Sequence, residues 1–410
     1  MLCVSAIALT GCRCARESVR RPDDDAVALV DASPSPPKKK GALRWVYVAG
    51  RIVDLDARKV AVAMPTPKIE LYDFDDGAFY GFRPPMLGAI ELPSGKGRWE
   101  IEDHSAAQRL ALFAEGSGLF VVFDDGVFRF DVRDGTRAFR TTTGSDPIVS
   151  AVHVEHGIVT LRASGGIDVV DTERGTMRAT IVTTPGPLYG TQSLVATTRH
   201  DSFCSIALTM TDYSVRCFAP TGKPWSKAIV PTDVVLQAVG ARHLLFSSSY
   251  FGSKHRSYVV SASDGAIVAH LPIEAAAIVE RDDALDAVLT ADKTIDLYEP
   301  SGARAWSVTE GYGDAAAVVA VDDRLIVAHW DRISTGSSLF SVDRRTGKVL
   351  WKADVVQLSI AHSKYRNDCE LVRRGDEVAL IGREAGGEYV QLFDVVTGKR
   401  LFAFALPSPF

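Results

Sequence analysis

Residues 338–351 read SLFSVDRRTGKVLW. An apolar stretch is followed by an aspartate, a turn that contains Thr-Gly-Lys, and a second apolar stretch that ends in tryptophan. Asp343 lies four residues before Gly347, and Trp351 lies four residues after it. Similar segments recur along nearly the whole chain, which predicts a protein built from repeats.

The composition of the 410-residue chain fits one large array of such repeats. Hydrophobic residues make up 46% of the chain and charged residues 24%, so the chain can bury a substantial core. Short apolar segments separated by Gly, Asp and Asn-type turns predict an all-β structure. The formal net charge of -5 gives no dominant basic surface, which argues against a nucleic-acid partner.

The N-terminus carries a different signal. Residues 2–9 form the apolar run LCVSAIAL, and Thr10, Gly11 and Cys12 follow it directly. This order resembles a bacterial lipobox, which implies a signal peptide over residues 1–11 and lipidation at Cys12. No Lys or Arg precedes the run, unlike an ordinary secretory signal. The alternative is an apolar N-terminal strand with an incidental cysteine.

Residues 13–42 alternate basic, acidic and Pro-Ser-Pro-Pro blocks with few large apolar side chains. Such a composition cannot bury enough surface to fold, so we expect a flexible tether over residues 12–42 between the lipidated cysteine and a folded body over residues 43–410.

The repeats have turn glycines at regular intervals. Reading from the N-terminus, they are Gly77, Gly135, Gly175, Gly222, Gly265, Gly302, Gly347 and Gly398. Their average spacing is about the length of a four-stranded propeller blade. The long first gap contains a further similar turn, PSGKGRW at residues 93–99, which is either an extra hairpin or a ninth, degenerate unit. We therefore predict a β-propeller of about eight four-stranded blades, with seven as the alternative.

Each residue of the repeated segment has a physical role. Glycine supplies a positive φ at the turn, and the aspartate can accept hydrogen bonds from the turn amides. The aromatic residue can lie flat on the neighbouring blade and hold it. The positions assigned to this blade docking are Asp131, Gly135, Phe139, Asp171, Gly175, Gly302, Trp306, Asp343, Gly347, Trp351, Asp394, Gly398 and Phe402.

The segments DRRTGKVLW (343–351) and DVVTGKRLF (394–402) resemble the tryptophan docking repeat of the pyrroloquinoline-quinone-like propellers. That superfamily includes quinoprotein alcohol dehydrogenases and the lipoprotein subunit of the bacterial outer-membrane β-barrel assembly machine. The resemblance covers residues from about 43 to 410. It leaves two functions open, redox catalysis and protein binding.

The residues favour protein binding over a quinone site. Quinone-dependent members typically carry a vicinal disulfide, a tryptophan under the cofactor and an acidic base, but this chain has no adjacent cysteine pair. The acidic pairs 75–76, 124–125, 282–283 and 322–323 fall at predicted turns, where Asp accepts backbone hydrogen bonds, and none has the spacing of a calcium loop. His153 and His156 have no zinc-type partners nearby in the sequence.

The cysteines give one structural candidate. Cys204 and Cys217 flank a predicted hairpin symmetrically, so they can pair across two strands as a disulfide in an oxidising compartment. The alternative is two small apolar residues in a sheet, and the sequence leaves both open.

Together these observations predict a lipid-anchored, extracytoplasmic propeller that acts as a non-enzymatic scaffold, with no catalytic residue, cofactor or metal site assigned. Its expected partners are other envelope proteins, bound through loops on one face of the propeller, and the membrane, bound through Cys12. Exposed apolar residues on those loops, such as Tyr250, Phe251 or Tyr312, would favour protein binding. Arg13 follows Cys12 where an inner-membrane retention signal would have Asp, which favours the outer membrane. The alternatives are a quinone-dependent oxidoreductase with its cofactor in the axial funnel and a ligand-binding propeller.

Overall fold

A computed structural model describes residues 43–407, apart from 65–68, 76, 103–106, 143, 182–191, 209–211, 220–223, 249–254, 283, 292–293, 310–314, 332–335, 357, 359–366 and 385. The described residues are all β-structure and turns, and they form nine antiparallel sheets. The part of the chain that is described contains no helix long and apolar enough to cross a membrane.

The sheets follow the chain as simple meanders, and we number them as blades 1 to 9. Blades 1 to 4 comprise β1 (Trp45–Val48), β2 (Arg51–Asp54), β3 (Lys59–Ala63); β4 (Leu71–Phe74), β5 (Ala78–Arg83), β6 (Met86–Glu91), β7 (Gly97–Glu102); β8 (Arg109–Glu115), β9 (Gly118–Phe123), β10 (Gly126–Asp131), β11 (Arg137–Thr142); and β12 (Ile148–Val154), β13 (Gly157–Arg162), β14 (Ile167–Asp171), β15 (Met177–Ile181). Blades 5 and 6 comprise β16 (Gln192–Ala196), β17 (Phe203–Leu208), β18 (Asp212–Phe218), β19 (Pro224–Pro231); and β20 (Val234–Val239), β21 (His243–Ser248), β22 (Ser257–Ser261), β23 (Ile267–Leu271). Blades 7 to 9 comprise β24 (Ala275–Arg281), β25 (Ala284–Thr290), β26 (Ile295–Tyr298), β27 (Arg304–Val308); β28 (Ala315–Val321), β29 (Arg324–Asp331), β30 (Gly336–Asp343), β31 (Val349–Ala353); and β32 (Asp368–Arg374), β33 (Glu377–Glu384), β34 (Gly387–Asp394), β35 (Arg400–Pro407).

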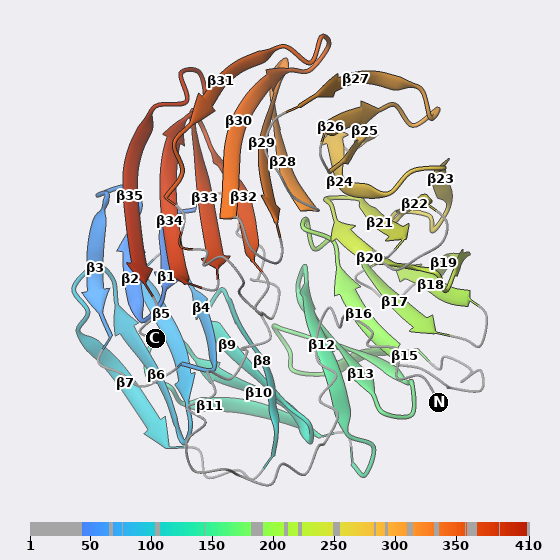
Figure 1. Cartoon of the computed structure of the whole chain (residues 1–410). Helices are drawn as coiled ribbons and strands as arrows, with labels where there is room; N and C mark the ends of the chain where they lie inside the picture. Colours follow the sequence, from blue (N-terminus) through green and yellow to red (C-terminus); the bar gives the residue numbers. More distant parts are fainter. Residues whose placement is uncertain are drawn as a thin grey trace, which may run out of the picture.

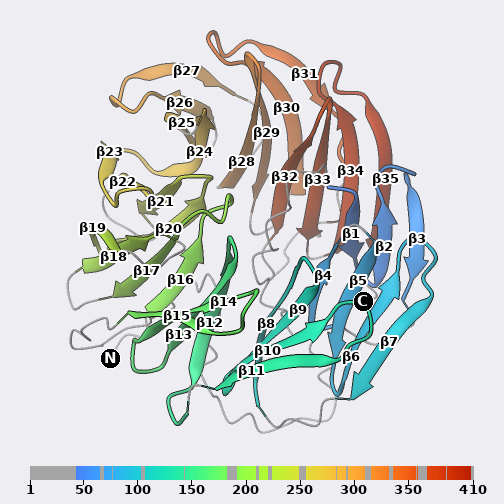
Figure 2. The same cartoon turned by 180° about the vertical axis from the view of Figure 1, so that it is seen from behind.

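The sheets are arranged as a propeller (Figure 1), and Figure 2 shows the same order from behind. The first strands of neighbouring blades contact one another, as β4 contacts β8 and β24 contacts β28. In the four-stranded blades the first strand is therefore the inner strand, and the last strand of each blade lies at the rim. Among the described residues, blade 1 has three strands and every other blade has four.

The prediction of eight or seven blades was wrong, because the region read as one unit forms two blades. The turn of residues 93–99 closes a complete blade: Gly95 has φ +71° and donates its N–H to the carbonyl of Glu91 at 2.8 Å. Gly77 lies instead in the tight turn between β4 and β5, where Asp75 Oδ1 accepts its N–H at 2.8 Å. The corresponding turn of blade 1 carries Arg58 at φ +51°, so a search for glycine misses it.

The core is divided among the interfaces between blades. Nine apolar clusters can be distinguished in the described residues, and each joins two neighbouring sheets. One of them places Val46 and Val53 of blade 1 with Val390 and Leu392 of blade 9. Each pair of neighbouring blades, including blades 9 and 1, shares one of these clusters. The ring is therefore closed.

Among the described residues, blades 1 and 9 are joined through side chains. Arg58 forms an ion pair with Glu377 at 2.8 Å, and Arg374 pairs with both Asp56 and Glu377. Figure 1 shows the first blade, in blue, beside the last, in red.

Candidate functional site

The docking turn is the element that the sequence marks most clearly. Asp343 Oδ1 accepts the backbone N–H of Arg345 at 3.1 Å and that of Thr346 at 2.8 Å. The N–H of Gly347 donates to the carbonyl of Asp343 at 2.9 Å, and Gly347 has φ +70°. The turn is therefore fixed from within, by the aspartate and by a backbone angle that favours glycine.

The same bonds recur in other blades. The carboxylates of Asp394 and Asp171 each accept two turn amides, and Asp131 accepts one. Hydrogen bonds from the Thr346 side chain and backbone hold the pKa of Asp343 below its ordinary value. An Arg133 side chain bonded to Asp131 lowers the pKa of that carboxyl to about 2. These carboxylates stay ionised at neutral pH and serve the turn.

Aromatic side chains join each of several turns to the preceding blade. Trp306 lies on Gly347 of the next blade, where a Cβ atom would be 2.7 Å from Cγ of the indole. Phe139 lies on Gly175 in the same way. Trp306 Nε1 also donates to the carbonyl of Arg344, the residue after the turn aspartate, at 2.7 Å.

The structure adds one docking residue and shows two apolar substitutes. Trp99, at the end of the turn of residues 93–99, lies on Gly135 and donates to the carbonyl of Val132 at 2.9 Å. Aliphatic side chains take the corresponding place elsewhere, Val62 against Gly95 and Leu271 against Gly302. Phe402 of the last blade packs in the cluster shared with blade 1.

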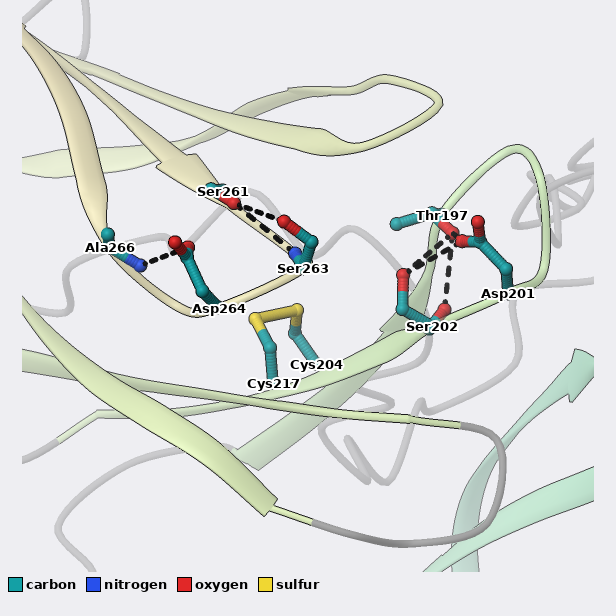
Figure 3. The surroundings of a disulfide bond; sticks show 9 residues. All are labelled: Thr197, Asp201, Ser202, Cys204, Cys217, Ser261, Ser263, Asp264 and Ala266. Carbon is teal, nitrogen blue, oxygen red and sulfur yellow. Dashed lines mark hydrogen bonds between the residues drawn. A yellow bond between two sulfur atoms is a disulfide. The ribbon is translucent and has the colours of Figure 1, made fainter. Parts of the chain in front are cut away.

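Cys204 and Cys217 lie opposite each other on β17 and β18. Their sulfur atoms are 2.12 Å apart, and their Cα atoms 4.0 Å apart, which describes a disulfide. Figure 3 shows it beside the turn that carries Ser261 and Asp264 of the next blade. Both cysteines are fully buried and belong to the apolar cluster between blades 5 and 6. Cys369 is a free, buried thiol, while Cys3, Cys12 and Cys14 lie outside the described residues.

A titratable cluster, which the sequence analysis missed, lies where three inner strands end. Glu115 ends β8, His153 lies near the end of β12, and His200 follows β16. His153 Nε2 is 3.3 Å from Glu115 Oε2, and His200 Nδ1 donates to the His153 carbonyl at 2.5 Å. Burial lowers the pKa of His200 to about 4. Burial also raises the pKa of Glu115, but hydrogen bonds from His153 and Thr172 outweigh it and lower that pKa.

A second cluster joins blades 6 and 7. Glu280, near the end of β24, accepts the N–H groups of Ala241 at 2.5 Å and Arg242 at 2.8 Å and lies 2.7 Å from His243 Nδ1. Burial opposes ionisation of Glu280, yet these donors lower its pKa overall. The carboxylate therefore accepts hydrogen bonds from the turn that precedes β21 and links blade 7 to blade 6.

Asp73 is the most unusual acid of the described region. It lies on β4, is 7% exposed, and accepts the N–H of Phe74 and of Ala114 on the next blade, both at 2.7 Å. Burial raises its pKa to about 7 despite these bonds. Asp73 is thus a buried link between blades 2 and 3 whose charge depends on pH.

These charged groups mainly stabilise turns and contacts between blades. Within the described ranges, no group of three or more His, Cys, Asp or Glu residues is placed to hold a metal ion. Asp124 and Asp125 form the tight turn between β9 and β10. The aromatic residues whose exposure would favour protein binding, Tyr250, Phe251 and Tyr312, lie outside the described residues.

One protein-family model matches the C-terminal part of the chain. The model of the family described as outer membrane protein assembly factor BamB matches residues 291–406, which include β26 through most of β35. Over this segment the chain is similar to the BamB family, whose repeats are PQQ-like. No curated protein matches it in sequence.

Solved structures resemble it at low sequence identity. One, titled a eukaryotic initiation factor, is 11% identical with a TM-score of 0.54, over 88% of this chain and 96% of that one. BamB from Moraxella catarrhalis is 13% identical with a TM-score of 0.44, over 80% of this chain and 95% of that one. A quinohemoprotein alcohol dehydrogenase from Comamonas testosteroni is 12% identical with a TM-score of 0.47, over 83% of this chain and 67% of that one. The first of these likenesses supports the fold alone.

Proposed function

We propose that this protein is a lipid-anchored propeller outside the cytoplasm that acts as a non-enzymatic, protein-binding scaffold in assembly of the cell envelope. The observation that carries the proposal is the match of residues 291–406 to the family model of an outer membrane protein assembly factor. The matched segment contains the two most complete docking turns, at Asp343 and Asp394.

A rigid ring suits this role. The docking turns are held by internal hydrogen bonds and by aromatic residues of the preceding blade, as at Gly347 and Gly398. Loops carried by such a frame keep fixed relative positions, so a partner can bind several blades without ordering them first. Protein partners would be contacted by the loops on one face.

The N-terminal part of the proposal rests on sequence. The signal peptide over residues 1–11 would be removed, Cys12 would receive the lipid, and residues from 13 onward would connect the anchor to the propeller. Arg13 supports placement at the outer membrane, facing the periplasm.

The role in assembly can be tested by removing the protein from its host. We expect the outer membrane to contain less β-barrel protein, wild-type protein to restore it, and Cys12→Ala protein at equal abundance to restore less. An unchanged content of barrel proteins in the deletion strain would overturn the assembly role.

The anchor is tested separately by growth with a palmitate analogue. Wild-type protein should be labelled and sediment with the outer membrane, whereas the Cys12→Ala variant should carry no label. Label that persists in the variant would refute lipidation at Cys12 while leaving the scaffold role open.

A further inference from the structure

A hollow of about 320 Å³ lies between the outer parts of blades 2 and 3. The end of β7 forms one side of it, and β9, β10 and β11 form the other. The side chains that line it are those of Ile101, Glu102, Phe123, Phe128, Phe130 and Arg137. Figure 1 shows β7 and β11 at the outer edge of the ring. The hollow is therefore a groove at the rim, away from the charged clusters where the inner strands end.

The floor of the groove is aromatic and is held in place by its own blade. The rings of Phe123 and Phe128 meet edge to face, with their centres 4.9 Å apart. The guanidinium of Arg140 lies 4.8 Å from the centre of the Phe128 ring and pairs with Asp125 at 2.7 Å. Phe128 is thus fixed by a ring on one hand and a cation on the other, so the floor is already ordered before anything binds.

Blades 4 and 9 have a different residue at the position of Phe128, three residues before the turn aspartate. Asp168 takes this position in blade 4 and forms an ion pair with Arg162 at 3.0 Å. Gln391 takes it in blade 9 and exchanges hydrogen bonds with the backbone of Val356 at 2.9 and 3.3 Å. Blade 3 therefore presents an apolar ring to the groove at a position where these two blades carry polar side chains that are bonded internally.

The two ends of the groove carry opposite charges. β7 and β11 are both the fourth strands of their blades, so both run from a docking turn toward the connection to the next blade. Arg137 is the first residue of β11 and Glu102 is the last residue of β7, and both residues are exposed. Arg137 therefore lies at the docking-turn end of the groove, and Glu102 lies at the other end.

This arrangement fits a segment of another protein better than a small molecule. Small-molecule pockets enclose most of the ligand surface, whereas this groove is open at the rim, where Arg137 and Glu102 are exposed. The volume admits one large side chain, and phenyl rings in the floor offer it edge-to-face contacts. Charges of opposite sign at the two ends select a segment with an acidic and a basic residue on either side of that side chain.

We propose that this groove binds a segment of a partner protein in which an aromatic residue stands between an acidic and a basic residue. The aromatic side chain enters the groove against Phe128, the acidic side chain pairs with Arg137, and the basic side chain pairs with Glu102. The inference rests on the proposed scaffold role, because it names a surface and a partner chemistry for protein binding.

Binding of dye-labelled peptides to the purified full chain, followed by fluorescence anisotropy, tests the proposal. The probe is Gly-Asp-Phe-Lys-Gly with blocked ends. A peptide with Ala in place of Phe should bind about tenfold more weakly, because it buries no aromatic ring. A peptide with Lys in place of Asp should bind about threefold more weakly, because it loses the pairing with Arg137.

Variants of the groove should change these preferences. Arg137→Glu leaves acidic groups at both ends, so the peptide with two lysines should then bind about threefold more tightly than the probe. Arg174→Glu makes the same charge change on the docking turn of blade 4 and should leave the preference of the wild type. Ile101→Trp fills the groove from β7 and should weaken binding of the probe about tenfold. Urea denaturation checks that each variant is folded.

Equal binding of the probe and the alanine peptide would overturn the proposal, and so would a charge preference that Arg137→Glu leaves unchanged. Sedimentation distinguishes another occupant: a wild-type dimer that Ile101→Trp converts to a monomer would assign the groove to a second copy of the chain and overturn the proposal as well. The content of barrel proteins in the deletion strain is measured separately. A groove that binds no peptide would therefore leave the assembly role standing.

Discussion

Trp351 of blade 8 lies flat on Gly398 of blade 9, so closely that a Cβ atom at position 398 would be 2.5 Å from Cδ2 of the indole. The indole Nε1 donates to the carbonyl of Val395 at 3.0 Å. One side chain therefore fixes the distance between two blades by contact and their register by a hydrogen bond. The molecule has no core common to all blades, so contacts of this kind determine its stability.

Truncation of the Trp351 side chain should destabilise the protein strongly. We predict that Trp351→Ala lowers the free energy of unfolding by about 3–5 kcal/mol, the usual effect of removing a buried tryptophan. Leu350→Ala, at a neighbouring position that is 41% exposed, should change it by less than about 0.5 kcal/mol. Urea denaturation measures both. A loss below about 0.5 kcal/mol for Trp351→Ala would show that the residue does not hold the blades together.

Gly398, the glycine that Trp351 covers, should be equally sensitive to substitution. Gly398 and Gly375 both have positive φ, +71° and +61°, but no atom lies within 4 Å of a Cβ at position 375. Gly375→Ala should cost only the backbone strain, about 1–2 kcal/mol. Gly398→Ala should cost about 1–3 kcal/mol more, because the methyl group displaces Trp351. Equal losses in the two variants would contradict the close contact.

The Cys204–Cys217 disulfide should stabilise the folded state against the reduced chain. For a sequence separation of 13 residues, the expected effect is about 3 kcal/mol. Denaturation with and without reductant should differ by this amount in the wild type and by nothing in the Cys204→Ala/Cys217→Ala variant. A reductant effect that survives in the double variant would have to come from another cysteine.

Asp73 should give the stability a distinctive pH dependence. Its pKa is raised from 3.8 to about 7, so in this range the unfolded chain is ionised while the folded protein keeps a proton. The free energy of unfolding therefore falls as pH rises from about 4 to about 7, and the loss is complete above pH 7. Between pH 5 and pH 8, wild type should lose about 3 kcal/mol relative to Asp73→Asn. Carboxylates with lowered pKa values, such as Glu115, are present in both proteins, so their pH-dependent contributions to the free energy of unfolding cancel in this comparison. A difference that is independent of pH would contradict a protonated Asp73.

The sequence predicted the β-propeller because its docking turn is local. Asp343, Gly347 and Trp351 all lie within nine residues of the chain, so their spacing can be read directly from the sequence. In blade 1 the same turn carries Arg58 and Val62 in place of glycine and an aromatic residue. The backbone still takes a positive φ there, but the residue types do not reveal it.

The groups between the blades could not be predicted in the same way. Glu115, His153 and His200 lie on three different blades, and only the closed ring brings them together. Asp73 is an ordinary strand residue in the sequence, and its raised pKa comes from burial beside blade 3. Sites assembled from separate repeats leave no motif of fixed spacing.

The central functional claim is that the propeller works by holding proteins and carries no redox cofactor. The most direct measurement is an absorbance scan and metal analysis of the purified full chain after addition of pyrroloquinoline quinone and Ca²⁺. We predict no stoichiometric uptake of either. Tight uptake of one quinone and one Ca²⁺ per chain would contradict the scaffold proposal and support an oxidoreductase.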